Sequence, residues 1–167
     1  MKNPSKHIRV LGIAPSSYGC GFALIEGESI LVDWGVKKVK GDKNARCLSH
    51  VGNLIAHYEP NVIAVEDTRS KGSRRGSRVQ ALIQEIARMA ENEKIKVKRF
   101  SRKQLSIGFL SNEHGTKHDM ALHLATRFPD ELGPQLPPKR RTWENEDYRM
   151  DIFAAVALAE HFLRGRE

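Results

Sequence analysis

The hydrophobic pattern of this 167-residue chain changes its period part of the way along, and this change constrains the fold more than any other feature. Residues 8–14, 19–26 and 29–39 are apolar or alternate between apolar and polar positions, which is typical of β-strands. The links between them are short and contain turn residues such as Pro15 and Gly27. Three consecutive strands joined in this way predict an antiparallel meander.

The rest of the chain alternates between helical spacing and short apolar runs. It predicts, in order, a helix over 48–58, a strand over 61–67, a helix that starts at Ser77 and carries an apolar face over 79–90, a strand over 95–100, a helix over 116–128, a Pro-rich connection over 129–142 and a helix over 145–163. The order β-β-β-α-β-α-β-α-α favours an α/β fold in one domain, residues 1–167. We expect a five-stranded mixed sheet, three antiparallel strands followed by two parallel additions, with helices on both faces.

Positive charge is clustered in the sequence, and the formal net charge is +8. Clustered cations indicate a nucleic-acid partner, although solvated loops would explain each cluster by itself. The predicted DNA-binding residues fall into three groups: Arg69, Lys71, Arg74, Arg75 and Arg78; Arg102 and Lys103; and Lys139, Arg140 and Arg141. Trp143, next to the third group, is either a stacking platform for bases or a core anchor for the last helix.

Two features limit the compartment and the class of protein. Cys20 and Cys47 are too few and too far apart in the sequence to indicate a disulfide framework or a zinc site. No apolar run approaches the length of a membrane span, and the first residues lack the apolar segment of a signal peptide. We therefore expect a soluble cytoplasmic protein without a membrane partner.

Three motifs resemble a known family. Gly12-Ile13-Ala14-Pro15-Ser16-Ser17 stands where the family has Gly-Ile-Asp-Pro-Gly-Ser, and Val65-Glu66 ends the fourth strand as in the family. The segment 151–159 matches Asp-x-x-Asp-Ala-x-Ala-x-Ala except at Ala154. The chain thus resembles the ribonuclease H-like superfamily and, more narrowly, the RuvC Holliday junction resolvases, with alanine at two catalytic Asp positions. A rival alignment places Asp151 at the second Asp, but it loses the small residues that follow.

The resemblance implies a Mg²⁺-dependent, structure-selective endonuclease, a crossover junction endodeoxyribonuclease-like hydrolase of DNA recombination and repair that acts as a homodimer. It also implies a catalytic site at Ala14, Glu66, Asp151, Ala154 and Lys117. Two Mg²⁺ ions, or Mn²⁺ in their place, need carboxylate oxygens that converge from several elements. Only Glu66 and Asp151 remain as metal ligands, so we expect weakened metal binding and lost cleavage.

The alanines have two explanations. They were introduced to trap uncut DNA, which the intact remainder of each motif favours, or the chain is a natural pseudonuclease that binds branched or single-stranded DNA. The sequence also does not distinguish between junctions, flaps and forks as the DNA substrate. A paired cut of a four-way junction needs two active sites related by two-fold symmetry, and the apolar face over 79–90 is the predicted dimer contact.

Overall fold

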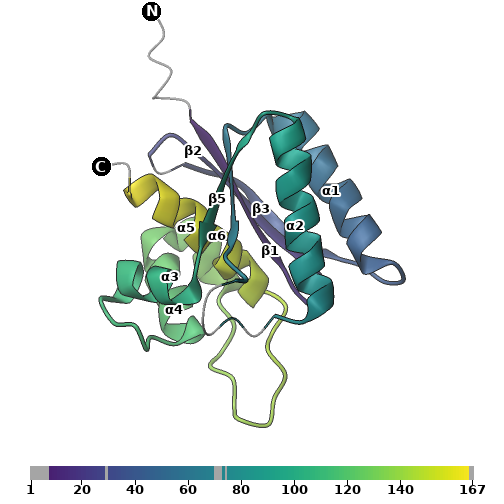
Figure 1. Ribbon diagram of the computed structural model, residues 1–167. Coiled ribbons are helices and arrows are strands. Elements are labelled where there is room, and N and C mark those ends of the chain that lie inside the picture. The colour runs from purple at the N-terminus through teal and green to yellow at the C-terminus, as the bar shows by residue number, and fades with distance from the viewer. Residues whose placement is uncertain (1–7, 29, 70–72, 74, 166–167) are drawn as a thin grey trace, which may run out of the picture.

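A five-stranded mixed sheet forms the centre of the computed structural model, which describes residues 8–28, 30–69, 73 and 75–165. Its strand order is β3-β2-β1-β4-β5 (Figure 1). The antiparallel part consists of β1 (Arg9–Pro15), β2 (Gly19–Glu26) and β3 (Ile30–Lys38). Parallel to β1 run β4 (Val62–Glu66) and then β5 (Lys96–Phe100). The predicted arrangement of three antiparallel strands followed by two parallel additions is confirmed.

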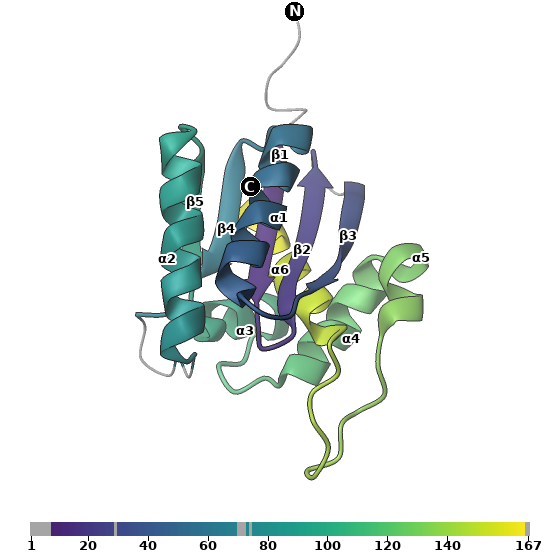
Figure 2. The same cartoon turned by 90° about the vertical axis from the view of Figure 1, so that its right-hand side faces the viewer.

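Helices cover both faces of this sheet, as expected. One face packs against α1 (Lys43–Tyr58) and α2 (Ser77–Asn92). The other carries α6 (Met150–Arg164), with α3 (Arg102–Leu110), α4 (Lys117–Arg127) and the short α5 (Pro129–Leu132) beside it. Figure 2 shows α1 in front of the strands and α6 behind them. The molecule therefore has one hydrophobic core on each side of the sheet.

Side chains of successive strand residues enter these two cores alternately. In β1, Leu11 and Ile13 belong to the core under α1 and α2, whereas Val10 and Ala14 belong to the core under α6. The same alternation holds in β4, where Val62 and Ala64 face α6. Side chains two apart on a strand share a face, so the end of β4 directs Glu66 towards α6 and the next residue towards α2.

The backbone of α6 lies directly on the sheet at two glycines. A Cβ atom added at Gly12 would lie 2.0 Å from the carbonyl oxygen of Ala155, and one added at Gly21 would lie 2.3 Å from that of Asp151. Any larger residue at these two positions would push the helix away. The glycines therefore set the height of α6, and with it the position of Asp151 and Ala154 above the strands.

Several predicted boundaries were wrong. The helix α3 was not predicted, and α6 begins at Met150 rather than at residue 145. Residues 129–142 are not an unbroken connection, because α5 and a 3-10 turn over Gly133–Gln135 lie within them. In α1 the helix begins at Lys43, where the Asp42 side chain accepts a hydrogen bond from the backbone N–H of Ala45.

The predicted dimer contact over 79–90 was also wrong. Leu82, Ile86 and Ala90 on that face are fully buried in the chain's own core between α2 and the sheet. They cannot form an interface without unpacking this core. In the part of the chain that the structure describes, no helix is long and apolar enough to cross a membrane.

The two cysteines, distant in sequence, meet in space. Cys20 on β2 and Cys47 on α1 are both free and fully buried in the core under α1. A hydrogen bond with Cys47, together with burial, raises the pKa of the Cys20 thiol well above its ordinary value. Sequence separation was thus a poor guide to the distance between these thiols.

Candidate functional site

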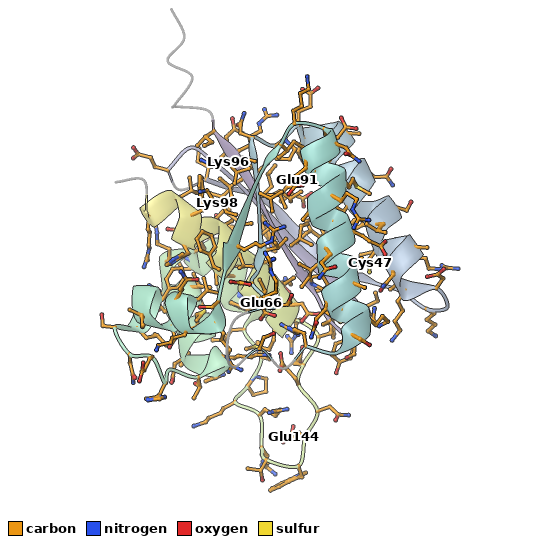
Figure 3. All side chains as sticks on the ribbon, viewed as in Figure 1. Cys47, Glu66, Glu91, Lys96, Lys98 and Glu144 are labelled. Atoms are coloured by element: carbon orange, nitrogen blue, oxygen red, sulfur yellow. The ribbon has the colours of Figure 1, made fainter. Side chains whose placement is uncertain are left out.

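A cavity of about 30 Å³ opens where the C-terminal ends of β1 and β4 meet α6. Its lining contains Ala14, Glu66 and Ala154, three of the five residues predicted for the catalytic site, together with Pro15, Arg75, Ile83, Leu105 and Leu158. Figure 3 shows Glu66 near the middle of the molecule, at the end of β4. The fold therefore brings together residues from positions 14, 66 and 154. Ala154 lines the cavity, whereas Asp151 does not.

The carboxylate of Glu66 is held by an arginine. The Nε of Arg75 donates a hydrogen bond to Oε2 of Glu66 at 3.0 Å, and the two side chains are 27% and 20% exposed. Arg75 lies just before α2, whose Gln80 side chain donates to the Arg75 carbonyl oxygen. Because this pair is largely shielded from solvent, its attraction is screened less than that of a surface pair.

Asp151 is buried in the first turn of α6, with a carboxylate that contacts a serine. Oδ2 of Asp151 accepts a hydrogen bond from the Ser16 hydroxyl, and Ser16 Oγ in turn accepts one from the backbone N–H of Tyr18 at 3.1 Å. Burial raises the pKa of Asp151 to about 6, although the Ser16 hydrogen bond acts in the opposite direction. The nearby Glu146 carboxylate raises this pKa further, whereas Arg75 and Lys117 lower it.

Lys117 lies beside this group, at the first residue of α4. Its Nζ is 3.1 Å from an Oε atom of Glu146, in the loop that precedes α6. The Glu146 carbonyl oxygen also accepts a hydrogen bond from the Tyr18 hydroxyl at 2.5 Å. Asp147, next to Glu146, lies before α6 and pairs with Arg149, which lowers its pKa. Lys117 is therefore paired with an acid near Asp151, and it is not among the residues that line the cavity.

Sequence reasoning missed Ser16, Tyr18 and Glu146. Ser16 stood inside the first motif, so its position beside the predicted acids was an available signal. Tyr18 and Glu146 carried none, because their contact joins segments 128 residues apart in the sequence.

These residues do not fit a two-metal centre. Magnesium needs several oxygen ligands around each ion, yet the cavity contains a single carboxylate, already paired with Arg75. The second remaining acid, Asp151, is not among the lining residues and its oxygen is bound by Ser16. Within the described ranges, no three His, Cys, Asp or Glu side chains are grouped so that they could hold a metal ion.

The predicted DNA-binding residues fall into different environments. Arg78 makes hydrogen bonds within the protein: its two terminal nitrogens donate to Asn44 Oδ1 and to the Ser16 carbonyl oxygen. Lys71 and Arg74 lie outside the described residues. Arg69 is exposed beyond β4, and Arg102 and Lys103 are exposed in the first turn of α3. The third group, Lys139, Arg140 and Arg141, is also exposed, in the long loop that extends below the sheet in Figure 1.

Trp143 is 75% exposed in this loop, with the Arg141 guanidinium 5.5 Å from its ring centre. Figure 3 shows the neighbouring Glu144 at the end of the loop, well away from Glu66. Trp143 is thus not a core anchor, and its role as a stacking platform for bases stays a prediction.

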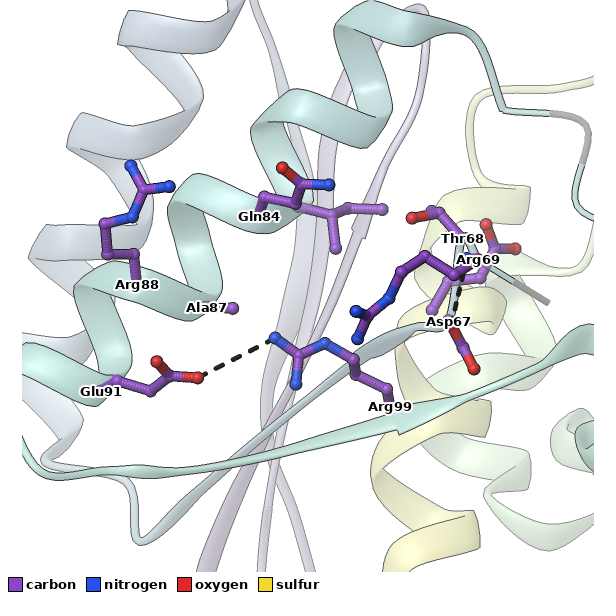
Figure 4. Close-up of a pocket in the computed structure, with 10 residues that line it drawn as sticks. Asp67, Thr68, Arg69, Gln84, Ala87, Arg88, Glu91 and Arg99 are labelled. Atoms are coloured by element: carbon purple, nitrogen blue, oxygen red, sulfur yellow. Dashed lines mark hydrogen bonds and ion pairs between the residues drawn. The ribbon is translucent and has the colours of Figure 1, made fainter.

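A second, larger hollow of about 350 Å³ lies between α2 and the β5 edge of the sheet, on the side of Asp67 (Figure 4). Arg69, Arg88 and Arg99 line it, and Arg99 reaches the Glu91 carboxylate at 3.9 Å. Glu66 lines both hollows, so the arginine-lined surface is continuous with the candidate site.

The sheet order and the helices on both faces define the ribonuclease H-like fold in its RuvC-like form. No protein-family model matches the sequence, and no curated protein matches it. Among solved structures, RuvC of Thermus thermophilus is similar with a TM-score of 0.68 and 18% identity, over 95% of this chain and 97% of that one.

The same RuvC in complex with a Holliday junction substrate gives a TM-score of 0.68 and 16% identity, over 96% and 97% of the two chains. The yeast mitochondrial Holliday junction resolvase Ydc2 gives 0.66 and 15%, over 98% of this chain and 80% of that one. The expected RuvC-like fold is confirmed, at identities that establish the fold alone.

Proposed function

We propose that this chain binds branched DNA, four-way junctions above all, and does not cleave it. One observation carries the proposal: Ala14 and Ala154 line the same cavity as Glu66. The positions that the resemblance assigns to metal-binding aspartates therefore converge, but they provide no oxygen ligand. Phosphodiester hydrolysis by two metal ions needs those ligands to hold the ions that activate water and stabilise the leaving oxygen.

Similarity and charge support the DNA partner. One of the similar structures is a RuvC bound to a Holliday junction substrate. In this chain, exposed cations lie at the start of α3 and in the loop before α6, and three arginines line the hollow next to the site. Such cations neutralise phosphates and release counterions, which is the main source of affinity for nucleic acid.

Gel-shift binding at one fixed salt concentration tests the partner. A four-way junction, a duplex and a single strand of matched length and sequence are compared, and we expect the junction to bind most tightly. Equal affinity for all three would contradict junction recognition and leave a generic nucleic-acid binder.

A restored variant tests the lost chemistry. If the parental form is a Mg²⁺-dependent endonuclease, the double variant Ala14→Asp, Ala154→Asp should cut a junction in Mg²⁺ or Mn²⁺, while the present chain should not. The variant Ala14→Asn, Ala154→Asn controls for size and polarity without adding negative charge. No cleavage of any branched substrate by the aspartate variant would favour a natural pseudonuclease, which the Arg75–Glu66 pair also supports.

The proposed assembly is a homodimer, because a junction with two-fold symmetry offers two equivalent sites. Its interface would use surfaces other than the buried face of α2. Sedimentation over a concentration series should show a dimer, and a monomer at every concentration would refute this.

A further inference from the structure

Arg75 places a fixed positive charge inside the candidate site. Its guanidinium lines the cavity with Ala14, Ala154 and Glu66, and its Nε is bound to the Glu66 carboxylate. A divalent ion drawn to Glu66 would meet this cation at close range and would have to displace it. The arginine and a metal ion are therefore competitors for one carboxylate.

Without a metal, the site carries at most one uncompensated negative charge, that of Asp151. Glu66 is paired with Arg75, and Lys117 with Glu146, while the two alanines add nothing. A site with four carboxylates, as the resemblance implies, would instead need two divalent ions to approach neutrality. The loss of two acids and the presence of Arg75 change the electrostatic balance in the same direction.

Arg75 also has hydrogen-bonding capacity to spare. A guanidinium carries five N–H donors in a planar fork that matches a phosphate group. Among the described residues only its Nε has a hydrogen-bond partner, so the Nη1 and Nη2 groups can receive phosphate oxygens. Its side chain is 27% exposed, which leaves it open to a ligand on one side.

We infer that Arg75 takes the place of a divalent ion in this site and binds a phosphate of the DNA backbone directly, so that DNA binding here does not depend on metal. The inference rests on the proposed function, since it needs DNA at this face of the molecule. Under this inference Glu66 holds no metal ion. Its carboxylate orients the Arg75 guanidinium and competes with the phosphate for that guanidinium.

Opposite effects of two substitutions test this. Junction affinity is measured in EDTA for the present chain, Arg75→Ala and Glu66→Gln, with Lys96→Ala as a control that removes one positive charge from the opposite end of the sheet (Figure 3). We expect Arg75→Ala to bind on the order of tenfold more weakly, with the salt-dependence slope reduced by about one. Glu66→Gln should bind severalfold more tightly, because it frees Arg75 and removes a repelling carboxylate.

A metal-dependent site predicts the reverse for Glu66→Gln, which would then weaken binding in Mg²⁺. Because Mg²⁺ also changes the shape of a junction, the quantity compared is the ratio of variant to parent affinity in the same buffer. In a second measurement without DNA, electron paramagnetic resonance follows Mn²⁺ binding. The present chain should bind none, and Ala14→Asp, Ala154→Asp should bind it.

The outcomes separate the two proposals. If the chain binds no DNA in either buffer, the proposed function fails and the inference with it. If the chain binds junctions but Arg75→Ala is no weaker than Lys96→Ala, or Glu66→Gln is weaker than its parent, the proposed function stands and the inference is overturned. Junction binding seen only in Mg²⁺, or Mn²⁺ bound by the present chain, would overturn it as well.

Discussion

Replacing Asp151 by asparagine should make the protein more stable relative to its parent as the pH rises from acidic to alkaline values. The pKa of this carboxyl rises from 3.8 to about 6 in the folded chain, chiefly through burial. Folding therefore favours its protonated form. The stability that this contributes is fully present below the unfolded-state pKa and is lost as the pH rises through the folded-state pKa.

The size of the pKa shift of Asp151 sets the expected change in the free energy of unfolding. Two pKa units and a little more correspond to about 3 kcal/mol, because each unit is worth about 1.4 kcal/mol. At about pH 4 Asp151 is already partly ionised in the unfolded chain, so part of this destabilisation of the parent is present there. The free energy of unfolding of Asp151→Asn, minus that of the parent, should thus grow by about 2 to 3 kcal/mol between about pH 4 and about pH 8.

Urea unfolding in EDTA, followed by circular dichroism at several pH values, measures this difference. The asparagine can still accept the Ser16 hydrogen bond, and any cost of its unpaired N–H group is the same at every pH. The titration of histidines and other carboxyls is common to both proteins and cancels in the difference. A difference that stays flat with pH, or that falls as the pH rises, would refute the view that burial of an ionisable Asp151 destabilises the fold.

Three further perturbations have defined outcomes. Gly12→Ala should cost about 3 kcal/mol in urea unfolding, because its Cβ would lie 2.0 Å from a backbone oxygen of α6. Gly133→Ala, with nothing within 4 Å of the added Cβ, should be nearly neutral, and equal effects of the two substitutions would exclude close helix packing as the cause. Glu160→Ala should cost about 1 to 2 kcal/mol, because its 3% exposed carboxylate contacts Arg127 and Arg164, whose own side chains stay 39% and 35% exposed and can be solvated when it is removed. Glu113→Ala, at an exposed pair, should leave the unfolding midpoint unchanged, and a similar loss there would refute the role of burial. Both buried thiols should react with maleimide only as fast as the protein unfolds, and rapid labelling of the native protein would show that the core under α1 opens locally.

Periodicity predicted the sheet well because the strands are clearly two-sided. In β1 and β4, alternate residues enter different cores, and this pattern is visible in the sequence. The helix α3 escaped because it is only nine residues long, with three buried residues, Leu105, Ser106 and Phe109. Its clearest local signal was the capping box of Ser101 and Gln104, whose side chains each bond the other residue's backbone.

The candidate site was predictable where motifs carried it and unpredictable where distant segments meet. Ala14, Glu66 and Ala154 were expected together and line one cavity. The hydrogen-bond partners of the remaining acids were not predictable. Glu66 is bound by Arg75, which lies just before α2, and Asp151 is bound by Ser16, in the turn after β1. Such contacts depend on the register of the fold rather than on any local pattern.

The glycine contacts beneath α6 have a consequence for how such a site can change. Since main-chain atoms of the helix and the strands hold each other in place at Gly12 and Gly21, the supports of positions 14 and 154 do not depend on the side chains there. Catalytic groups can then be exchanged one at a time while the platform stays intact. A lineage, or an experimenter, can separate recognition from reaction on this scaffold without first having to rebuild it.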